Sequence, residues 1–355
     1  MQMAKLGDYA NFIMGQAPAS SDCNTDGIGT PFVKAGQFGD SSPIINEWTT
    51  NPLKMAEEND VLICVVGATS GKLNRGADCA IGRSVAAIRP CAGANRDYIY
   101  YGLHPWIMRL RNSSQGSAIG VITKDMLDSV EMPFPKIEEQ SVMVQNLKTL
   151  EKIINQRKSE LQLLDTLIKA RFVEMFGDPI INSKNKDTQD LKDVLVLKAG
   201  DFTAASDISE EPTETNIYPC YGGNGIRGYV ADYNQEGEYS LVGRQGALSG
   251  NVQYAEGKFR NTEHALLVTP IIEMNSIWLN QLLINLDLKR YQTGAAQPGL
   301  SVKNLQEIPI IMVSIDEQNR YADFVKQVDK SKVAVKNALD QTKLLFESLM
   351  QRYFG

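Results

Sequence analysis

The chain of 355 residues has little of what builds metal sites, disulfide frameworks and membrane spans. It contains 5 cysteines, an odd number with no C-x-x-C pair, and 2 histidines, His104 and His264, neither of which has a carboxylate or cysteine at ligand spacing. These features argue against a disulfide framework and a zinc site. No segment offers the roughly 20 apolar residues of a membrane span, and the first 15 residues resemble no targeting signal. We therefore expect a cytoplasmic protein with no membrane association.

Basic charge is not in excess either. The chain has 36 Lys and Arg against 42 Asp and Glu, a net charge of −6. A protein that coats nucleic acid by bulk attraction would be positively charged. The balance still allows recognition of nucleic acid by local basic loops.

The sequence also lacks recognisable catalytic and nucleotide-binding motifs. Residues 223–228 fit G-x-G-x-x-G, but residues 229–233 are typical of a strand, whereas the dinucleotide fingerprint opens a helix. Residues 67–72 have three residues between the glycines where a phosphate loop needs four. No G-x-S-x-G, H-E-x-x-H or Pro-Pro-aromatic methyltransferase motif is present. We expect no catalytic site, no cofactor and no metal in this chain.

Two long helices are the dominant feature of what is there. Residues 137–177 and 315–355 share one design: Glu138 and Asp316 lie 178 positions apart, and so do Phe176 and Phe354. Because no residue was gained or lost between the copies, a duplication is indicated. At about 1.5 Å per residue, some forty residues predict a rod of about 60 Å.

Each rod carries a narrow apolar seam of the coiled-coil kind. The seam positions are Leu147, Leu150, Ile154, Leu161, Leu164, Ile168 and Met175 in the first copy and Val325, Val328, Val335, Leu339, Phe346, Leu349 and Tyr353 in the second. A rod with one apolar stripe needs a partner stripe, and the other copy is the nearest candidate. Two independent surface helices, each packed on its own domain, are the alternative.

The segments between the rods predict two related, loop-rich domains. Short β-branched runs at 11–14, 31–33 and 60–66 predict strands, and 97–111 predicts one helix. After a polar linker at 182–190 the domain begins again, because 246–250 matches 67–71 and 303–304 matches 124–125, both 179 positions later. The expected layout is 1–136, domain; 137–177, helix; 178–314, domain; 315–355, helix.

Glycine-rich loops in both domains carry long polar donors. Arg and Lys pair with guanine edges or phosphates, Asn and Gln pair with adenine edges, and Gly lets backbone amides approach a phosphate. The candidate DNA-binding residues are Gln16, Lys34, Gln37, Ser70, Lys72, Arg83, Ser114, Gln115, Asn224, Arg227, Arg244, Gln245, Asn251, Arg260 and Asn261. Ordinary polar turns would explain many of them singly, so the signal is their concentration.

Taken together, these residues resemble the DNA-specificity subunits of type I restriction–modification enzymes. The resemblance covers essentially the whole chain and rests on the helix openings at 139–140 and 317–318, the repeated Phe-Gly ends, the runs 221–226 and 242–247, and the loop 115–118. It implies an α+β fold with an internal pseudo-twofold repeat. Two loop-rich, mainly β target-recognition domains would alternate with two long helices that pair as an antiparallel coiled coil.

The resemblance also implies a function. The chain would bind double-stranded DNA at a bipartite target with a fixed spacer, together with two modification (methyltransferase) subunits and the restriction (translocase and endonuclease) subunits. S-adenosylmethionine, ATP and Mg would belong to those partners. Two alternatives stay open: a two-lobed protein scaffold that recognises no DNA, and a self-contained methyltransferase, which the missing motifs disfavour.

Overall fold

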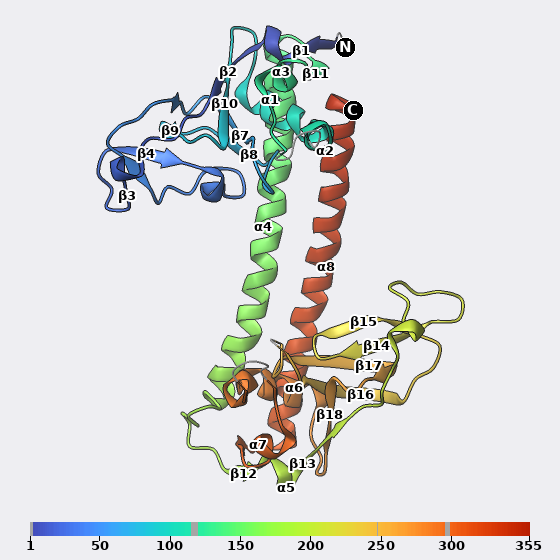
Figure 1. Cartoon of the computed structure of the whole chain (residues 1–355). Coiled ribbons are helices and arrows are strands. Elements are labelled where there is room, and N and C mark those ends of the chain that lie inside the picture. Colours follow the sequence, from blue (N-terminus) through green and yellow to red (C-terminus); the bar gives the residue numbers. More distant parts are fainter. Residues whose placement is uncertain (1–2, 115–119, 247, 295–298) are drawn as a thin grey trace. The chain divides into compact units, whose positions relative to one another are not determined.

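A computed structural model describes residues 3–114, 120–246, 248–294 and 299–355 of the chain (Figure 1). The fold divides into two compact units, Met1–Arg157 with Asn337–Gly355 (unit 1) and Lys158–Lys336 (unit 2). Both units combine helices with sheets, which confirms the α+β prediction. Each unit takes one half of each long helix, so the division falls inside the helices, whereas the sequence suggested a division at their ends.

The two long helices begin at the predicted residues, end one residue before the predicted bounds and have equal length. Helix α4 spans Ile137–Phe176 and helix α8 spans Ile315–Phe354, 40 residues each. Neither helix contains proline or glycine, so nothing in them breaks the backbone hydrogen-bond ladder. The predicted seams are turned inward, with Leu147, Val325 and Leu339 all buried. Among the described residues, no helix combines the length and apolarity that a membrane crossing requires.

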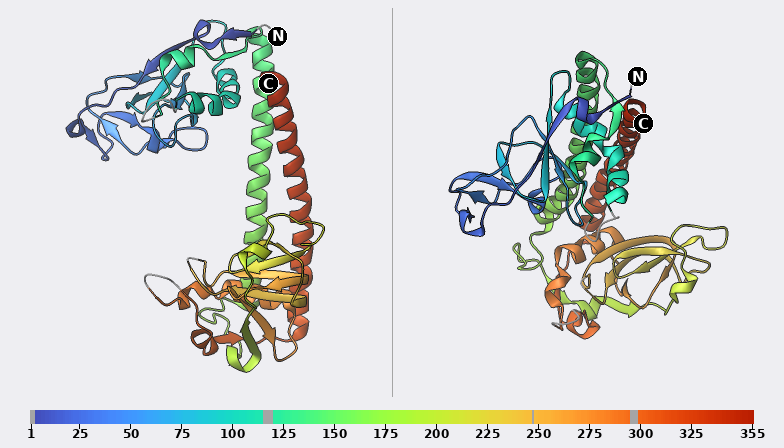
Figure 2. Two further views of the ribbon diagram at one scale, coloured as in Figure 1. Left: turned by 45° about the vertical axis from the view of Figure 1, so that its right-hand side comes forward. Right: turned by 45° about the horizontal axis from the view of Figure 1, so that its top comes forward.

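The helices α4 and α8 pack against each other in opposite directions, as separate contacts in each unit show (Figure 2). In unit 1, Asn146 Nδ2 donates a hydrogen bond to the Tyr353 hydroxyl at 3.2 Å. In unit 2, Lys332 Nζ lies 2.7 Å from Asp165 Oδ1. In unit 1 the first half of α4 therefore lies beside the last half of α8. In unit 2 the last half of α4 lies beside the first half of α8. The predicted antiparallel pairing is confirmed, and the alternative of two independent helices is wrong.

Unit 1 contains a two-stranded sheet (β1-β11), a four-stranded sheet (β2-β10-β7-β8) and a five-stranded sheet (β3-β5-β4-β9-β6). Its strands are β1 Met3–Lys5, β2 Ala10–Met14, β3 Cys23–Asn24, β4 Thr30–Val33, β5 Trp48–Thr49, β6 Met55–Ala56, β7 Val61–Cys64, β8 Leu73–Arg75, β9 Cys79–Ile81, β10 Val85–Pro90 and β11 Glu131–Pro133. Its shorter helices are α1 Arg96–Leu103, α2 Ile107–Ser114 and α3 Lys124–Asp128, with 3₁₀ turns η1 Leu6–Asp8, η2 Ser20–Asp22, η3 Ala35–Gln37 and η4 His104–Trp106.

Unit 2 contains a two-stranded sheet (β12-β19) and a six-stranded sheet (β13-β18-β16-β17-β14-β15). Its strands are β12 Thr188–Asp190, β13 Leu195–Ala199, β14 Tyr218–Gly222, β15 Gly225–Val230, β16 Gln235–Gly243, β17 Val252–Asn261, β18 Ala265–Pro270 and β19 Pro309–Ile311. Its shorter helices are α5 Leu191–Val194, α6 Ser276–Asn285 and α7 Val302–Gln306, with 3₁₀ turns η5 Ala205–Asp207 and η6 Leu288–Tyr291.

The strand orders show the predicted repeat. The order β2-β10-β7-β8 in unit 1 has the same pattern as β13-β18-β16-β17 in unit 2, and β1-β11 matches β12-β19. The units differ in what is inserted into this frame. Unit 1 adds the five-stranded sheet, whereas unit 2 adds the β14–β15 hairpin. The domains therefore share a frame and differ in their added segments.

Two details differ from the expectation. The helix expected at 97–111 is interrupted at His104–Trp106, because Pro105 cannot donate its backbone nitrogen to the helix ladder. The linker expected at 182–190 ends in strand β12, whose pairing partner β19 lies more than 100 residues later in the chain.

A buried glutamine joins the domain helix to the long helix in each unit. Gln140 Oε1 accepts the Asn95 backbone N–H at 2.9 Å, and Gln318 Oε1 accepts the Asn275 backbone N–H at 2.9 Å. Asn95 and Asn275 in turn cap the N-termini of α1 and α6 with their side chains. The same polar joint therefore appears twice, within unit 1 and within unit 2.

The repeated Phe-Gly ends supply the apolar part of each joint. Phe354 packs on Tyr98 of α1, with ring centroids 4.9 Å apart, and Phe176 packs on Trp278 of α6 at 6.1 Å. Each domain thus contacts the start of one long helix and the end of the other. That arrangement requires the helices to be antiparallel.

Candidate nucleic-acid interface

Three of the candidate residues in unit 1 come together just after the ends of strands β2, β4 and β9. The Gln16 backbone N–H donates to Ile81 O at 3.0 Å, and the Gly82 backbone N–H donates to Val33 O at 2.9 Å. These bonds bring Gln16, Lys34 and Arg83 onto neighbouring segments. Arg83 is exposed and pairs with no acid in the described part of the chain. Lys34 and Arg83 line an open cleft of about 950 Å³.

Lys34 and Gln37 are held by intramolecular contacts beside this cleft. Lys34 Nζ lies 2.6 Å from Glu47 Oε2. Gln37 Oε1 accepts the Lys34 backbone N–H at 2.9 Å, and its Nε2 donates to Asn46 and Glu47. An incoming phosphate would therefore compete with Glu47 for Lys34, so Lys34 is less available to bind a phosphate than Arg83 is.

The glycine-rich loop at 67–72 lies against helix α2. Lys72 Nζ donates to Phe38 O at 2.7 Å, and Arg111 Nη2 donates to Ala68 O at 3.3 Å. Arg111 belongs to α2. It opens the run 111–115, of which only Ser114 and Gln115 were among the candidates. We define surface 1 as Gln16, Lys34, Gln37, Lys72, Arg83 and Arg111.

Ser70 does not belong to surface 1. Its side chain is buried, and its hydroxyl has no hydrogen-bond partner in the described structure, so it is not presented to an incoming ligand. The prediction that Ser70 contacts DNA is therefore withdrawn. Gln115 and the side chain of Ser114 lie outside the described residues.

The candidate residues of unit 2 gather where the β14–β15 turn meets the end of β16. Asn251 Nδ2 donates to Asn224 Oδ1 at 2.9 Å. The Arg244 backbone N–H donates to His264 O at 3.0 Å, and Gln245 follows at an isolated bridge to Gly299. The side chains of Arg244 and Gln245 are exposed.

Arg227 lies on β15, close to the backbone of Gly222, and is also exposed. A Cβ at 222 would lie 2.4 Å from Arg227 Cδ, so a larger residue there would displace the Arg227 side chain. We define surface 2 as Asn224, Arg227, Arg244, Gln245 and Asn251.

Arg260 and Asn261 hold the fold together and are not part of surface 2. Arg260 Nη1 lies 2.8 Å from Asp232 Oδ2, and its Nε donates to Thr203. Asn261 is fully buried, and its backbone N–H donates to Asn234 at 2.7 Å. The prediction that these two side chains contact DNA is withdrawn, because both are committed to bracing neighbouring loops.

Sequence reasoning missed two exposed cations beside surface 2. Lys289 and Arg290 belong to η6, whose backbone contacts Gly250 so closely that a Cβ there would lie 2.7 Å from Lys289 N. Gly250 also has φ of +83°, which favours glycine. Arg111 takes the corresponding place in unit 1. The signal that could have found them is the repeat itself, which sets a basic segment against the same loop in both copies.

The family comparison matches both halves of the chain. The model described as type I restriction modification DNA specificity domain matches residues 1–163 and 183–342. The chain belongs to this family. Among the residues that the structure describes, no group of three or more His, Cys, Asp or Glu is placed to hold a metal ion.

Individual members of the family match different shares of this chain. The type I restriction enzyme EcoprrI specificity subunit of Escherichia coli is 40% identical over 154 residues, which cover 43% of this chain and 38% of that protein. The MjaVIII specificity subunit of Methanocaldococcus jannaschii is 20% identical over 380 residues, 92% of this chain and 86% of that protein. The match thus spans under half the length of the E. coli relative. The predicted resemblance to specificity subunits of type I restriction enzymes is thus confirmed at the level of the family.

Solved structures show the same fold. The type I restriction–modification S subunit from M. genitalium aligns over 100% of this chain and 96% of its own, with a TM-score of 0.66 and 18% identity. A chain from a study of complex assembly and conformational transition in the type I system aligns with a TM-score of 0.61 and 15% identity, covering 99% of this chain and 97% of its own. The predicted architecture of specificity subunits is confirmed.

Proposed function

We propose that this chain selects the DNA target of a type I restriction–modification enzyme. Surface 1 recognises one half of a bipartite site and surface 2 recognises the other. The helices α4 and α8 set the gap between the halves. The chain performs no chemistry itself and directs catalytic partners to the site.

One observation carries the proposal: two copies of one frame bear different added segments, and each carries its own cluster of DNA-compatible donors. Identical domains would suit a symmetric target. Domains that share strand order but differ in the five-stranded sheet and the β14–β15 hairpin suit two unlike half-sites. The matched joints at Gln140 and Gln318 would present both domains from the helices in the same way.

The side chains on both surfaces have the chemistry of base and phosphate recognition. Arg83, Arg227 and Arg244 are exposed guanidinium groups, which form bidentate pairs with guanine in the major groove. Gln16, Gln245 and Asn251 offer the amides that pair with adenine. Because the whole chain is acidic, this recognition is local and does not depend on bulk attraction.

The partners supply the chemistry. We propose two modification subunits that methylate adenine with S-adenosylmethionine, and restriction subunits that use ATP and Mg to translocate and cleave DNA. This chain contributes target choice and a scaffold on which these subunits assemble.

Two charge reversals test the proposal, and each is the matched control of the other. Arg83→Glu and Arg244→Glu make the same change on surface 1 and surface 2. Adenine methylation is measured with the reconstituted complex on a library in which each half-site is randomised separately. We expect R83E to change or abolish preference at one half-site only and R244E at the other only.

The opposite result would favour the scaffold alternative. If both variants assemble normally with the modification subunits and methylate the wild-type target at the wild-type rate, neither surface recognises DNA.

The role of the helices is tested by lengthening both. Insertion of seven residues after Arg157 in α4 and after Lys336 in α8 preserves the heptad seam and falls at the division between the units. Seven residues add about 10 Å of helix, or about three base pairs at about 3.4 Å each. We expect the preferred gap to lengthen by about three base pairs with both half-sites unchanged. An unchanged gap in a folded, active variant would show that the helices do not set the spacing.

A further inference from the structure

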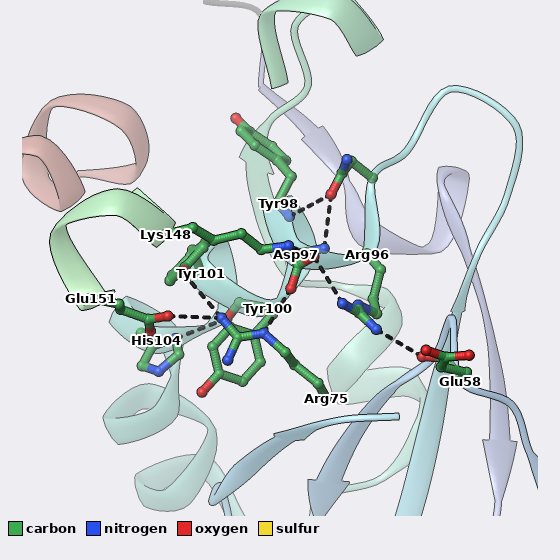
Figure 3. A network of polar contacts seen from close by, with 11 residues as sticks. Glu58, Arg75, Arg96, Asp97, Tyr98, Tyr100, Tyr101, His104, Lys148 and Glu151 are labelled. Atoms are coloured by element: carbon green, nitrogen blue, oxygen red, sulfur yellow. Dashed lines mark hydrogen bonds and ion pairs between the residues drawn. The ribbon is translucent and has the colours of Figure 1, made fainter. Parts of the chain in front are cut away.

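A network of charged side chains fastens the first domain to helix α4 within unit 1 (Figure 3). Arg75, the last residue of β8, is at its centre. Its Nε donates to Asp97 Oδ1 at 2.8 Å, and its Nη2 donates to Glu151 Oε2 at 3.0 Å and to the Tyr101 hydroxyl at 3.1 Å. The guanidinium also lies over the Tyr100 ring, 4.3 Å from its centroid. One side chain therefore ties a strand, helix α1 and helix α4 together.

Asp97 completes the connection from the domain side. Its Oδ2 lies 2.7 Å from Lys148 Nζ on α4 and 2.9 Å from Arg96 Nη2. Its side chain is only 8% exposed. Burial alone would raise the pKa of Asp97, but hydrogen bonds from Lys148, Arg75 and Arg96 outweigh burial and lower it to about 2. The carboxylate is therefore ionised throughout the physiological range.

A network whose central pair, Arg75 and Asp97, is largely withdrawn from water is better suited to fixing geometry than to adding stability. Removing ions from water costs much of what their attraction returns, so buried ion pairs add little net stability. The planar guanidinium, however, accepts few orientations when it bonds two carboxylates and stacks on a ring. We define the ionic clamp as Arg75, Asp97, Lys148 and Glu151.

Among the described residues of unit 2, no ionic clamp occurs at the equivalent place. The repeat pairs loop 67–72 with 246–251, the Asn95 cap with Asn275 and the start of α4 with the start of α8. The counterparts of Arg75, Asp97, Tyr100, Tyr101, Lys148 and Glu151 are then Tyr254, Ile277, Asn280, Gln281, Lys326 and Asp329. All six line an open cleft of about 900 Å³. The strand and the long helix, which the clamp bridges in unit 1, are separated here by that cleft.

Local bonds within the second domain replace the clamp. The Tyr254 hydroxyl donates to Glu238 Oε2 at 2.7 Å and lies 3.0 Å from Ser276 Oγ. Neither partner belongs to α8. Within the described residues of unit 2, the domain still contacts the long helices through the Gln318 joint, the Asn275–Asn319 hydrogen bond, the Lys186–Glu317 pair and a shared apolar core. None of these polar contacts comes from the strand that carries Tyr254.

We propose that Arg75, Asp97, Lys148 and Glu151 are positioning residues: they fix the orientation of the first domain on α4 and so restrict the DNA target to a single gap length. This inference rests on the proposed function. None of the four belongs to surface 1, so they act on the gap and not on the half-site sequences. The second domain carries no equivalent restriction.

The test uses a pair of matched substitutions, Lys148→Met and Lys326→Met. Both remove a lysine at the same position of the repeat, but only Lys148 belongs to the clamp. Each variant is reconstituted with the modification subunits, and adenine methylation is measured on DNAs with both half-sites fixed and the gap varied one base pair at a time. Arg75→Met and Arg75→Lys are measured alongside.

The quantity compared is the ratio of methylation at a gap one base pair longer or shorter to methylation at the preferred gap. We expect K148M and R75M to raise this ratio at least tenfold over the wild type. K326M should keep the wild-type dependence of methylation on gap length. R75K should give a ratio between those of wild type and R75M, because a lysine keeps the positive charge but cannot bond both carboxylates as the planar guanidinium does. If R75M does not fold, K148M, which removes a half-exposed partner, still decides the question.

Three results would overturn the inference. One is a wild-type gap profile in folded K148M, and another is equal broadening in K148M and K326M. The third is a loss of methylation in the same proportion at every gap, which indicates a purely structural role. If the wild-type complex itself shows no bipartite target, the proposed function fails first, so the two failures are distinguishable.

Discussion

The buried glutamine at the start of each long helix allows a quantitative prediction. Gln140 is fully buried, and its side chain makes three hydrogen bonds to backbone groups: it accepts from Asn95 N–H at 2.9 Å and donates to Gly93 O at 2.9 Å and Pro135 O at 2.8 Å. Gln140→Ala removes all three bonds and leaves the backbone groups of Gly93, Asn95 and Pro135 without them. At about 1 kcal/mol for each bond, we expect a loss of about 3 kcal/mol in the free energy of unfolding.

The counterpart in unit 2 makes fewer bonds and should cost less. Gln318 accepts from Asn275 N–H at 2.9 Å and donates to Val313 O at 3.0 Å, so Gln318→Ala should cost about 2 kcal/mol. Gln145→Ala is the control, since Gln145 lies on the same helix as Gln140 and is exposed; we expect a change within about 0.5 kcal/mol.

Urea denaturation followed by circular dichroism measures the free energies, and native-state hydrogen exchange assigns each effect to a unit. Q140A should raise exchange in peptides covering Asn95 and α1, and Q318A in those covering Asn275 and α6. Hydrogen exchange matters because two compact units need not unfold in one transition. Equal stability of Q140A and Q145A would refute the reasoning that these glutamines join domain to helix.

Three further predictions concern buried groups. The pKa of Asp97 is about 2 in the folded chain and about 3.9 in the unfolded chain, so its ionised form adds about 2 kcal/mol to the free energy of unfolding above pH 4. This contribution is lost as the pH falls toward 2, so the stability difference between wild type and Asp97→Asn should shrink between pH 4 and pH 2. A difference that stays constant over this range would contradict the prediction. Tyr321→Phe removes a buried hydroxyl that donates to an α4 carbonyl at 3.1 Å, so urea denaturation should show a loss of about 1 to 2 kcal/mol, whereas no loss would mean the bond adds nothing. Burial raises the pKa of Cys64 to about 11 and that of Cys79 to about 12. At pH 8 both thiols should therefore react with a thiol reagent only after unfolding, while the partly exposed Cys23 reacts in the native chain. Rapid labelling of Cys64 in the native chain would show that its strand opens readily.

The long helices could be predicted from sequence because their signal is local and is present twice. The seam repeats every three or four residues, no proline or glycine interrupts it, and the second copy fixes both ends at the same offset. The strands β2, β4 and β7 were also predicted within one or two residues, because β-branched runs bounded by turn residues mark them. Antiparallel pairing followed from the family resemblance, and the structure gives its physical reason in the two joints at Gln140 and Gln318.

The contribution of individual polar residues could not be predicted, because it depends on partners far away in the sequence. Asn261 resembles a loop donor, yet it is buried by contacts with Asn234, 27 residues earlier. Arg260 resembles a free cation, yet Asp232 neutralises it. Conversely, Arg111 was expected at the end of the helix predicted at 97–111 and was not among the candidates, yet it lies on α2 against the glycine-rich loop. A glycine-rich loop shows where a chain can approach a ligand, and only the packed structure shows which side chains are free to do so.

The most direct test of the central claim is to map adenine methylation in DNA from cells that express this chain with and without a modification subunit. The account predicts a new methylated motif of two unlike halves separated by a fixed gap, present only when both proteins are expressed. Absence of any new methylation, with both proteins shown to be expressed and associated, would contradict the claim that this chain selects a DNA target.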